Sequence, residues 1–318
     1  MEEKVVLVTG IGGNVGQGII RNIRSLSYNI KIIGTNVIAF TEGNHLCDAT
    51  YITPYAYDDG YVDSIVKIVK KEIVDLILPS TDYESYYLSK FINKIACTVV
   101  TSPFSTLEVY IDKYKTYNFH KQNNIPFAQS VLPSHYKGEF NECIAKPREG
   151  RGSRGIEINP KQYNYLDKDY LIQELHRGKE LTTAFYVTKD NELHGFISLE
   201  RSLSNGATKQ CEVVTEYDDK IKNILLKIIN CIDIKGSANM QFIVTDKGEI
   251  VPFEINCRIS GTNSIRHNFG FQDVKYTLQE YLYKEKLDLP KITKGKAIRI
   301  LMDVIYPDLN DESNAYIY

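Results

Sequence analysis

The first hundred residues alternate between two kinds of hydrophobic pattern, and this alternation constrains the fold more than any other feature of the chain. Three short, uninterrupted apolar segments are typical of strands buried on both faces. These segments are residues 5–8, 30–33 and 74–78. Between them, residues 15–23 look helical, and residues 61–72 repeat apolar side chains at the spacing of an amphipathic helix. Strands and helices in this order predict a parallel sheet covered on both faces, so we expect a Rossmann-like domain at residues 1–100.

The composition narrows the possible partners. The 318 residues include 38 Lys and Arg against 40 Asp and Glu, a formal net charge of −2, so no overall positive field attracts nucleic acid or an anionic membrane. No apolar run approaches the roughly 20 residues that cross a bilayer, and the acidic N-terminus lacks a basic leader segment. Six cysteines without a C-x-x-C pair fit a reducing compartment. We therefore expect a cytoplasmic protein that acts on small molecules, with no nucleic acid and no membrane as partner.

The alternation of buried strands and helices ends near residue 101. Residues 112–124 and the strongly periodic residues 219–232 predict helices. Several strands follow one another without helices between them, which predicts antiparallel pairing and an α+β half. The expected strands are residues 143–146, 170–173, 181–188, 193–199, 238–244 and 250–255. No linker rich in Pro or Gly separates the halves, so we expect them to pack closely.

Two glycine-rich turns are candidates for phosphate binding. Residues 9–18 fit the spacing T-G-x-x-G-x-x-G between a strand and a helix, but the second strand ends without the acidic residue that would hold an NAD ribose. These glycines therefore fit either nucleotide binding or close packing of the helix. Residues 146–155 place Lys146 before three glycines and a serine. Such a loop can direct backbone N–H groups at phosphates and close as a lid; a polar hairpin without a ligand is the alternative.

Two further segments carry chemistry. Glu254 and Asn256 share one face of a strand, and a hairpin turn at residues 246–248 brings Gln241 opposite them. One carboxylate with two neutral amide oxygens suits Mg²⁺, which keeps phosphates and waters among its ligands. Arg258 follows at the same spacing and can reach a transferring phosphoryl group. The other segment, residues 173–180, turns between two strands, and its backbone can hydrogen-bond the edge of an adenine base. The alternative for both is an ordinary polar surface.

These segments, together with Lys113, stand in the order found in ATP-grasp enzymes, and the chain resembles that superfamily over about residues 101–290. The most specific match is the strand pair Q…E-x-N-x-R at residues 241–258. The nearest type is the large subunit of carbamoyl phosphate synthetase and its stand-alone relatives. The resemblance implies a pre-ATP-grasp domain at residues 1–100 and an ATP-grasp domain at residues 101–318. Within the latter it implies a small nucleotide-covering subdomain (about 112–175) and a larger metal-binding subdomain (about 176–318).

The resemblance implies a role for each site residue. The lysines would contact ATP phosphates, the glycine-rich loop would cover them, residues 174–176 would hold adenine and Glu180 the ribose. The residues implied to bind ATP are Lys113, Lys146, Gly152, Ser153, Arg154, Glu174, Leu175, His176 and Glu180. The residues implied to bind Mg²⁺, or Mn²⁺ in its place, are Gln241, Glu254 and Asn256. Arg258 is implied to be catalytic, at the transferred phosphate.

The activity implied is that of a carboxylate–amine ligase. Such an enzyme uses ATP to convert a small-molecule carboxylate into an acyl phosphate, joins it to an amine or similar nucleophile, and releases ADP and phosphate. The chain departs from the pattern in two ways: it has Cys257 where relatives often carry Pro, and it has one ATP-grasp unit without a glutaminase part. Carbamoyl phosphate synthesis as such is therefore not expected. A homodimer is compatible with the resemblance.

Two alternatives come from other classes. An NAD(P)-dependent reductase of the short-chain type would use the turn at residues 9–16 with the pair Tyr117 and Lys121. A non-catalytic ATP-binding module would keep the fold but would not need Glu254, Asn256 and Arg258 together. The substrate is the least determined feature. Candidate contacts, each also readable as a surface group, are Thr81, Asp82, Glu84, Arg201 and Lys209.

Overall fold

The computed structural model describes residues 2–150, 154–204, 206–308 and 315–317. The N-terminal part is a five-stranded sheet in the order β3-β2-β1-β4-β5, and every adjacent pair is parallel. Its strands are β1 (Lys4–Val8), β2 (Ile30–Asn36), β3 (Ala49–Ile52), β4 (Leu76–Leu78) and β5 (Thr98–Val99). Its helices are α1 (Asn14–Arg24), α2 (Tyr61–Glu72) and α3 (Asp82–Lys90), with short turns η1 (Asn44–Leu46) and η2 (Ile92–Lys94). The predicted Rossmann-like fold is confirmed.

Alternate side chains of the central strands pack on opposite sides of this sheet. In β1, Val6 and Val8 belong to the core cluster that contains the apolar face of α1, whereas Leu7 belongs to the cluster that contains residues of α2 and α3. All three side chains are fully buried, which explains the continuous apolar run in the sequence. A later part of the chain, α8, completes the cover on the α1 side through Val274.

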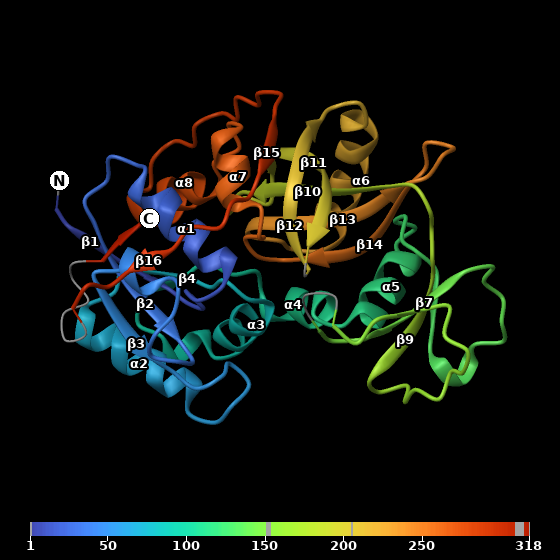
Figure 1. Cartoon of the computed structure of the whole chain (residues 1–318), viewed down its shortest axis with the longest axis horizontal. Coiled ribbons are helices and arrows are strands. Elements are labelled where there is room, and N and C mark those ends of the chain that lie inside the picture. Colours follow the sequence, from blue (N-terminus) through green and yellow to red (C-terminus); the bar gives the residue numbers. More distant parts are fainter. Residues whose placement is uncertain (1, 151–153, 205, 309–314, 318) are drawn as a thin grey trace.

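The second half contains two antiparallel sheets (Figure 1). The smaller has the order β6-β9-β7-β8 and the larger the order β14-β13-β10-β11-β12-β15. The smaller-sheet region comprises α4 (Phe104–Tyr110), α5 (Lys113–Gln122), β6 (Ser130–Val131), η3 (Pro133–His135), β7 (Cys143–Pro147), β8 (Glu157–Ile158) and β9 (Tyr170–Glu174). The larger sheet comprises β10 (Lys179–Val187), β11 (Leu193–Ser204), β12 (Ala207–Val214), β13 (Gly236–Val244), β14 (Ile250–Asn256) and β15 (Lys296–Ile298). Helix α6 (Asp218–Cys231) packs its apolar face on this larger sheet, as its periodicity predicts.

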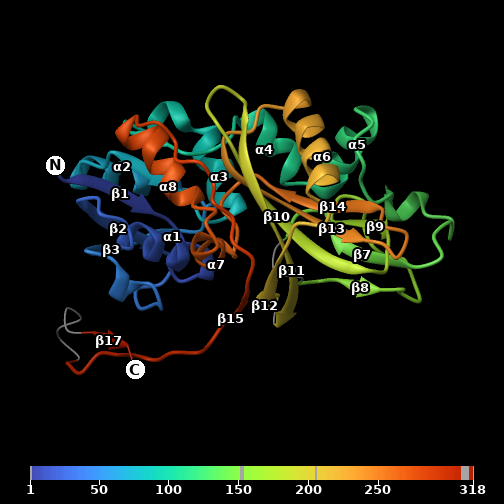
Figure 2. The same ribbon diagram turned by 90° about the horizontal axis from the view of Figure 1, so that it is seen from above.

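The end of the described chain returns to the N-terminal part. The elements are α7 (Asn263–Asn268), α8 (Asp273–Thr277), η4 (Leu278–Tyr283), and the strand pair β16 (Val304–Ile305) and β17 (Tyr316–Ile317). Figure 2 shows the chain leaving β15 and running past the N-terminal sheet. Within the described ranges, no helix combines the length and the apolar character that crossing a bilayer requires. The expected limits of the two subdomains stay predictions.

Candidate active site

A cavity of about 700 Å³ lies between the two antiparallel sheets. Strands β7 and β9 supply one wall, and β13 and β14 supply the other. Most residues that the sequence singled out line this cavity. They are Lys113, Lys146, Arg154, Glu174, Leu175, His176, Glu180, Gln241 and Glu254. Gly152 and Ser153 lie outside the described residues.

Lys146 places a buried amine in the cavity wall. Only 5% of the residue is exposed, and its Nζ donates hydrogen bonds to Oε1 of Gln173 at 2.7 Å and to the carbonyl oxygen of Phe253 at 3.3 Å. Burial lowers the pKa of Lys146 to about 7, and the charge of Lys113 adds to the shift. Both bonds go to neutral oxygens, and the charge of Glu254 acts on the amine without a direct ion pair among the described residues, so the amine can also bind an anionic ligand.

Lys113 begins α5, where a network of polar contacts fixes it. The N-cap of this helix, Asp112, accepts from the backbone N–H groups of Tyr114 and Lys115 at 2.8 and 3.2 Å. Asp112 also forms an ion pair with Arg148, which follows β7. Lys113 Nζ donates to the carbonyl oxygen of Gly150 at 3.4 Å. The start of α5 is therefore tied to the loop that follows β7.

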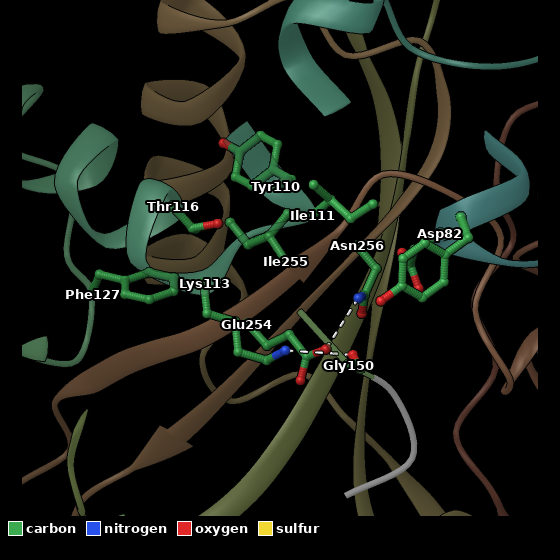
Figure 3. Close-up of a pocket in the computed structure, with 11 residues that line it drawn as sticks. Asp82, Tyr110, Ile111, Lys113, Thr116, Phe127, Gly150, Glu254, Ile255 and Asn256 are labelled. Carbon is green, nitrogen blue, oxygen red and sulfur yellow. Dashed lines mark hydrogen bonds between the residues drawn. The ribbon is translucent and has the colours of Figure 1, made fainter. Parts of the chain in front are cut away.

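Gln241, Glu254 and Asn256 come together as the hairpin predicts. Gln241 pairs directly with Glu254 across β13 and β14. Asn256 Nδ2 donates to Glu254 Oε1 at 3.1 Å, and Gln241 Nε2 donates to Asn256 Oδ1 at 3.3 Å. Figure 3 shows Lys113 beside the Glu254 carboxylate. Burial by itself raises the pKa of Glu254. The charges of Lys113, Lys146 and Arg258 and the hydrogen bond from Asn256 together outweigh burial, so the pKa lies below its ordinary value and the carboxylate is ionised at neutral pH.

Arg201, expected as a substrate contact, joins this site from β11 and contacts two other predicted site residues. Its guanidinium forms an ion pair with Glu180 at 2.9 Å and donates a short hydrogen bond to Oε1 of Gln241. The expected metal-binding oxygen of Gln241 and the expected ribose-binding carboxylate of Glu180 are thus both engaged by one arginine. The spacing of the motifs carries no signal for this contact, because it depends on the register of three strands.

Arg258 lies beyond the end of β14 and points toward the N-terminal part. Its Nη2 and Nε both donate to Oδ2 of Asp82, at 2.8 and 3.2 Å. Asp82 is the first residue of α3, and it lines a narrow pocket with Lys113, Glu254 and Asn256. Asp82, expected as a substrate contact, therefore orients Arg258 in this structure.

The rest of the expected contacts lie in different places. Glu174 and His176 face each other at 3.4 Å on the cavity rim. Thr81 and Glu84 form a capping box at the start of α3, a structural role for two expected substrate contacts. Lys209 is an exposed residue of β12.

Glycines of the turn at residues 9–18 pack closely against other protein atoms. A Cβ on Gly18 would lie 2.1 Å from Oδ1 of Asn263, and a Cβ on Gly16 would lie 2.6 Å from the carbonyl oxygen of Gly10. These glycines serve close packing, the second of the two alternatives for this turn. Tyr117 and Lys121 lie on α5 in the other half, with Lys121 Nζ over the tyrosine ring at 5.6 Å. The pair required by a reductase is thus not assembled at the turn.

Two family descriptions match the chain. Residues 110–262 match the ATP-grasp domain, and residues 6–101 match the PylC-like N-terminal domain. The chain therefore joins a region that matches an ATP-grasp domain to a preceding region that matches a PylC-like N-terminal domain, in line with the resemblance seen in the sequence.

Particular relatives are distant. The chain is 28% identical over 202 residues to the tyramine–L-glutamate ligase of Methanocaldococcus fervens, which covers 61% of this chain and 62% of that protein. It is 22% identical over 283 residues to the carbamoyl phosphate synthase large chain of Methanospirillum hungatei, covering 77% and 26%. The matched parts thus span less than two thirds of either relative. The crystal structure of N5-carboxyaminoimidazole synthetase from Staphylococcus aureus with ADP superposes with a TM-score of 0.77 at 12% identity, covering 94% and 82%, which shows a shared fold.

Proposed function

We propose that the protein is an ATP- and Mg²⁺-dependent ligase that activates a small-molecule carboxylate and joins it to an amine. The observation that carries this proposal is the meeting of Lys113, Lys146 and the ionised Glu254 at one cavity. The names of the relatives support it, since one is a tyramine–L-glutamate ligase. A cytoplasmic location and a homodimer stay predictions from the sequence.

The nucleotide would lie between the two sheets. Lys113 and Lys146 would bind phosphate oxygens, and the loop with Gly152, Ser153 and Arg154 would cover them. The strand end with Glu174, Leu175 and His176 would hold the adenine. Glu180 would accept from the ribose once it leaves Arg201, which is then free to contact a phosphate.

The residues present fit Mg²⁺. Among the described residues, no group of three or more His, Cys, Asp or Glu side chains could hold a metal ion. Mg²⁺ does not require one, because it is commonly held by one or two carboxylates together with substrate phosphates. Glu254 would supply a carboxylate oxygen, whereas the amide oxygens of Asn256 and Gln241 already accept hydrogen bonds from Gln241 and Arg201, respectively, and would have to rearrange to bind the ion. The ion, or Mn²⁺ in its place, would neutralise phosphate charge.

The reaction would have two steps, phosphoryl transfer and displacement of phosphate by the amine. A carboxylate oxygen attacks the γ-phosphorus of ATP, the bond to the β-phosphate oxygen breaks, and ADP leaves. Then the amine lone pair attacks the carbonyl carbon of the acyl phosphate, the C–O bond to phosphate breaks, inorganic phosphate leaves, and the proton lost by the amine passes to solvent. Arg258, held by Asp82, would stabilise the charge on the transferred group.

A substrate panel tests this proposal. ADP release is measured with Mg-ATP and pairs drawn from amino acids, hydroxy acids and amines, and we expect release above background that requires both members of one pair.

Thermal unfolding is a second test, because a ligand that binds only the folded state raises the midpoint of unfolding. We expect Mg-ATP to raise it and NADH to leave it unchanged. A shift with NADH alone would favour the reductase, and a shift with ATP but no release for any pair would favour a non-catalytic module.

A further inference from the structure

A second large cavity, of about 880 Å³, lies between the N-terminal part and residues 299–306. One face of α1 forms its floor, through Asn14, Gln17, Gly18 and Arg21, which recur at the spacing of a single helix face. Among the described residues, this α1 cavity shares no lining residue with the cavity between the antiparallel sheets. It is therefore a separate candidate site.

Two contacts hold residues 299–306 over α1. At one end, Arg299 donates a short hydrogen bond from Nη2 to the carbonyl oxygen of Gly261. At the other end, the rings of Phe40 and Tyr306 meet edge to face with centroids 5.1 Å apart. Figure 1 shows this segment passing α1 between the two ends. The cavity is thus bounded at both ends by side-chain contacts.

Two arginines bring positive charge to the α1 cavity. In the described part of the chain, neither Arg21 nor Arg299 forms an ion pair with a carboxylate. Burial lowers the pKa of Arg299, and the charge of Arg21 adds to this effect, so the two guanidinium groups repel each other. His45 also lines the cavity, where burial and the charge of Arg21 lower its pKa. An anion bound between the two arginines would relieve their repulsion.

The remaining wall is apolar. Ile38, Phe40, Ile300 and Ile305 belong to the lining and are 38–72% exposed, so their apolar surface is accessible to a ligand. Two exposed carboxylates, Glu42 and Asp303, also belong to the lining. Small-molecule sites of about 300–1,000 Å³ combine apolar walls with a few polar groups in this way.

We propose that the α1 cavity binds an organic acid with an apolar body, its carboxylate between Arg21 and Arg299 and its body against Ile38 and Phe40. The site does not depend on the proposed ligase activity. A substrate acid and a regulatory acid would make the same contacts in this cavity. Consumption of the acid in the presence of Mg-ATP distinguishes a substrate from an effector.

Calorimetric titration without ATP tests the site with 4-phenylbutyrate, acetate and the neutral 4-phenylbutyramide as probes. We expect 4-phenylbutyrate to bind more tightly than either of the others, because only it has both the charge and the apolar body.

Arg21→Gln should weaken the binding of 4-phenylbutyrate about tenfold or more, the scale of one lost charge-assisted contact. Arg24→Gln is the matched control, since Arg24 lies on the same helix but pairs with Asp48 at 2.7 Å. ATP affinity should be equal in both variants.

Equal binding of the acid and the amide, or equal affinity of the two arginine variants for the acid, would overturn the proposal. Addition of Mg-ATP then separates the two sources of the ligand. Consumption of the bound acid identifies a substrate. A changed rate of ADP release without its consumption identifies an effector.

Discussion

Lys146 is a buried amine whose protonation depends on whether phosphates occupy the cavity between the two antiparallel sheets. With a pKa of about 7 it is largely neutral at pH 8, whereas a lysine in an unfolded chain keeps its proton up to about pH 10. The unfolded chain therefore binds more protons between these values, so this group makes the nucleotide-free protein more stable as the pH rises from 7 to 10. Phosphates in the cavity would reverse the effect, because a nearby negative charge favours the protonated amine.

Proton uptake follows from this reversal. We expect Mg-ATP binding at pH 8 to take up close to one proton, seen as a binding enthalpy that changes with the ionisation enthalpy of the buffer. Lys146→Arg keeps a positive charge at all accessible pH values, so its binding enthalpy should depend much less on the buffer. Equal buffer dependence in both proteins would show that the proton goes elsewhere.

Glu254 is the carboxylate on which the metal site depends. Glu254→Gln keeps the shape and removes one negative charge, so we expect turnover to fall by about 10²–10³-fold, the scale of one lost electrostatic contact in a preorganised site. ADP release with a substrate pair from the panel measures this effect. Glu249→Gln, on the exposed hairpin between β13 and β14, is the control and should keep normal turnover. A Glu254→Gln protein within threefold of the wild type would contradict the metal assignment.

The ends of one strand and one helix determine where Arg258 lies in the candidate active site. Arg258 follows β14, and Asp82 begins α3 at the carboxyl end of β4. These two ends come from sequence positions 176 residues apart, and their ion pair joins the N-terminal part to the ATP-grasp domain. The orientation of the arginine is therefore set by a helix of the other domain.

Asp82→Ala tests this orientation. Without its partner, the guanidinium of Arg258 gains freedom, so we expect kcat to fall roughly tenfold while ATP affinity changes little. Steady-state kinetics and equilibrium ATP binding measure the two quantities. Asp59→Ala alters an exposed aspartate of the N-terminal part and should change neither. If Asp82→Ala weakened only ATP binding, the residue would serve the nucleotide rather than Arg258.

The elements that sequence reasoning predicted are those with strong periodicity or full burial. Helices α2 and α6 and the strands β1, β2, β13 and β14 follow from apolar spacing. Strand β3 was missed because its exposed and half-buried residues alternate at a sheet edge, and α3 because its apolar stripe is weak. The capping box of α3, with Thr81 three residues before Glu84, was a visible signal. The contacts of Arg201 and Asp82 could not be predicted, since each joins strands or domains whose placement no local pattern encodes.

In the molecule as a whole, α1 and α7 hold the N-terminal part against the segment that follows Arg258. Asn263 Nδ2 donates to the carbonyl oxygen of Val15 at 3.1 Å, and its side chain occupies the space above Gly18. The glycine therefore permits close contact between the N-terminal sheet and the segment that follows Arg258.

Gly18→Ala tests this contact. The added methyl group would overlap Asn263, so we expect a loss of about 1–3 kcal/mol in the free energy of unfolding, as overpacking usually costs. Chemical denaturation measures it. Gly13→Ala changes the same turn, but its Cβ would meet only the carbonyl oxygen of Gly10, at 3.5 Å, and should cost clearly less. Equal losses would show that the turn, and not the α1–α7 contact, is sensitive.

We expect the cavity between the two antiparallel sheets to form an acyl phosphate, and isotope transfer tests this most directly. A carboxylate substrate labelled with ¹⁸O is converted with its amine and Mg-ATP, and the released phosphate is analysed by mass spectrometry. We expect one ¹⁸O atom in the phosphate for each product formed, because the carboxylate oxygen that attacks phosphorus leaves with it. Label transfer should fall together with turnover in Glu254→Gln. Product formation with unlabelled phosphate would show that no acyl phosphate forms.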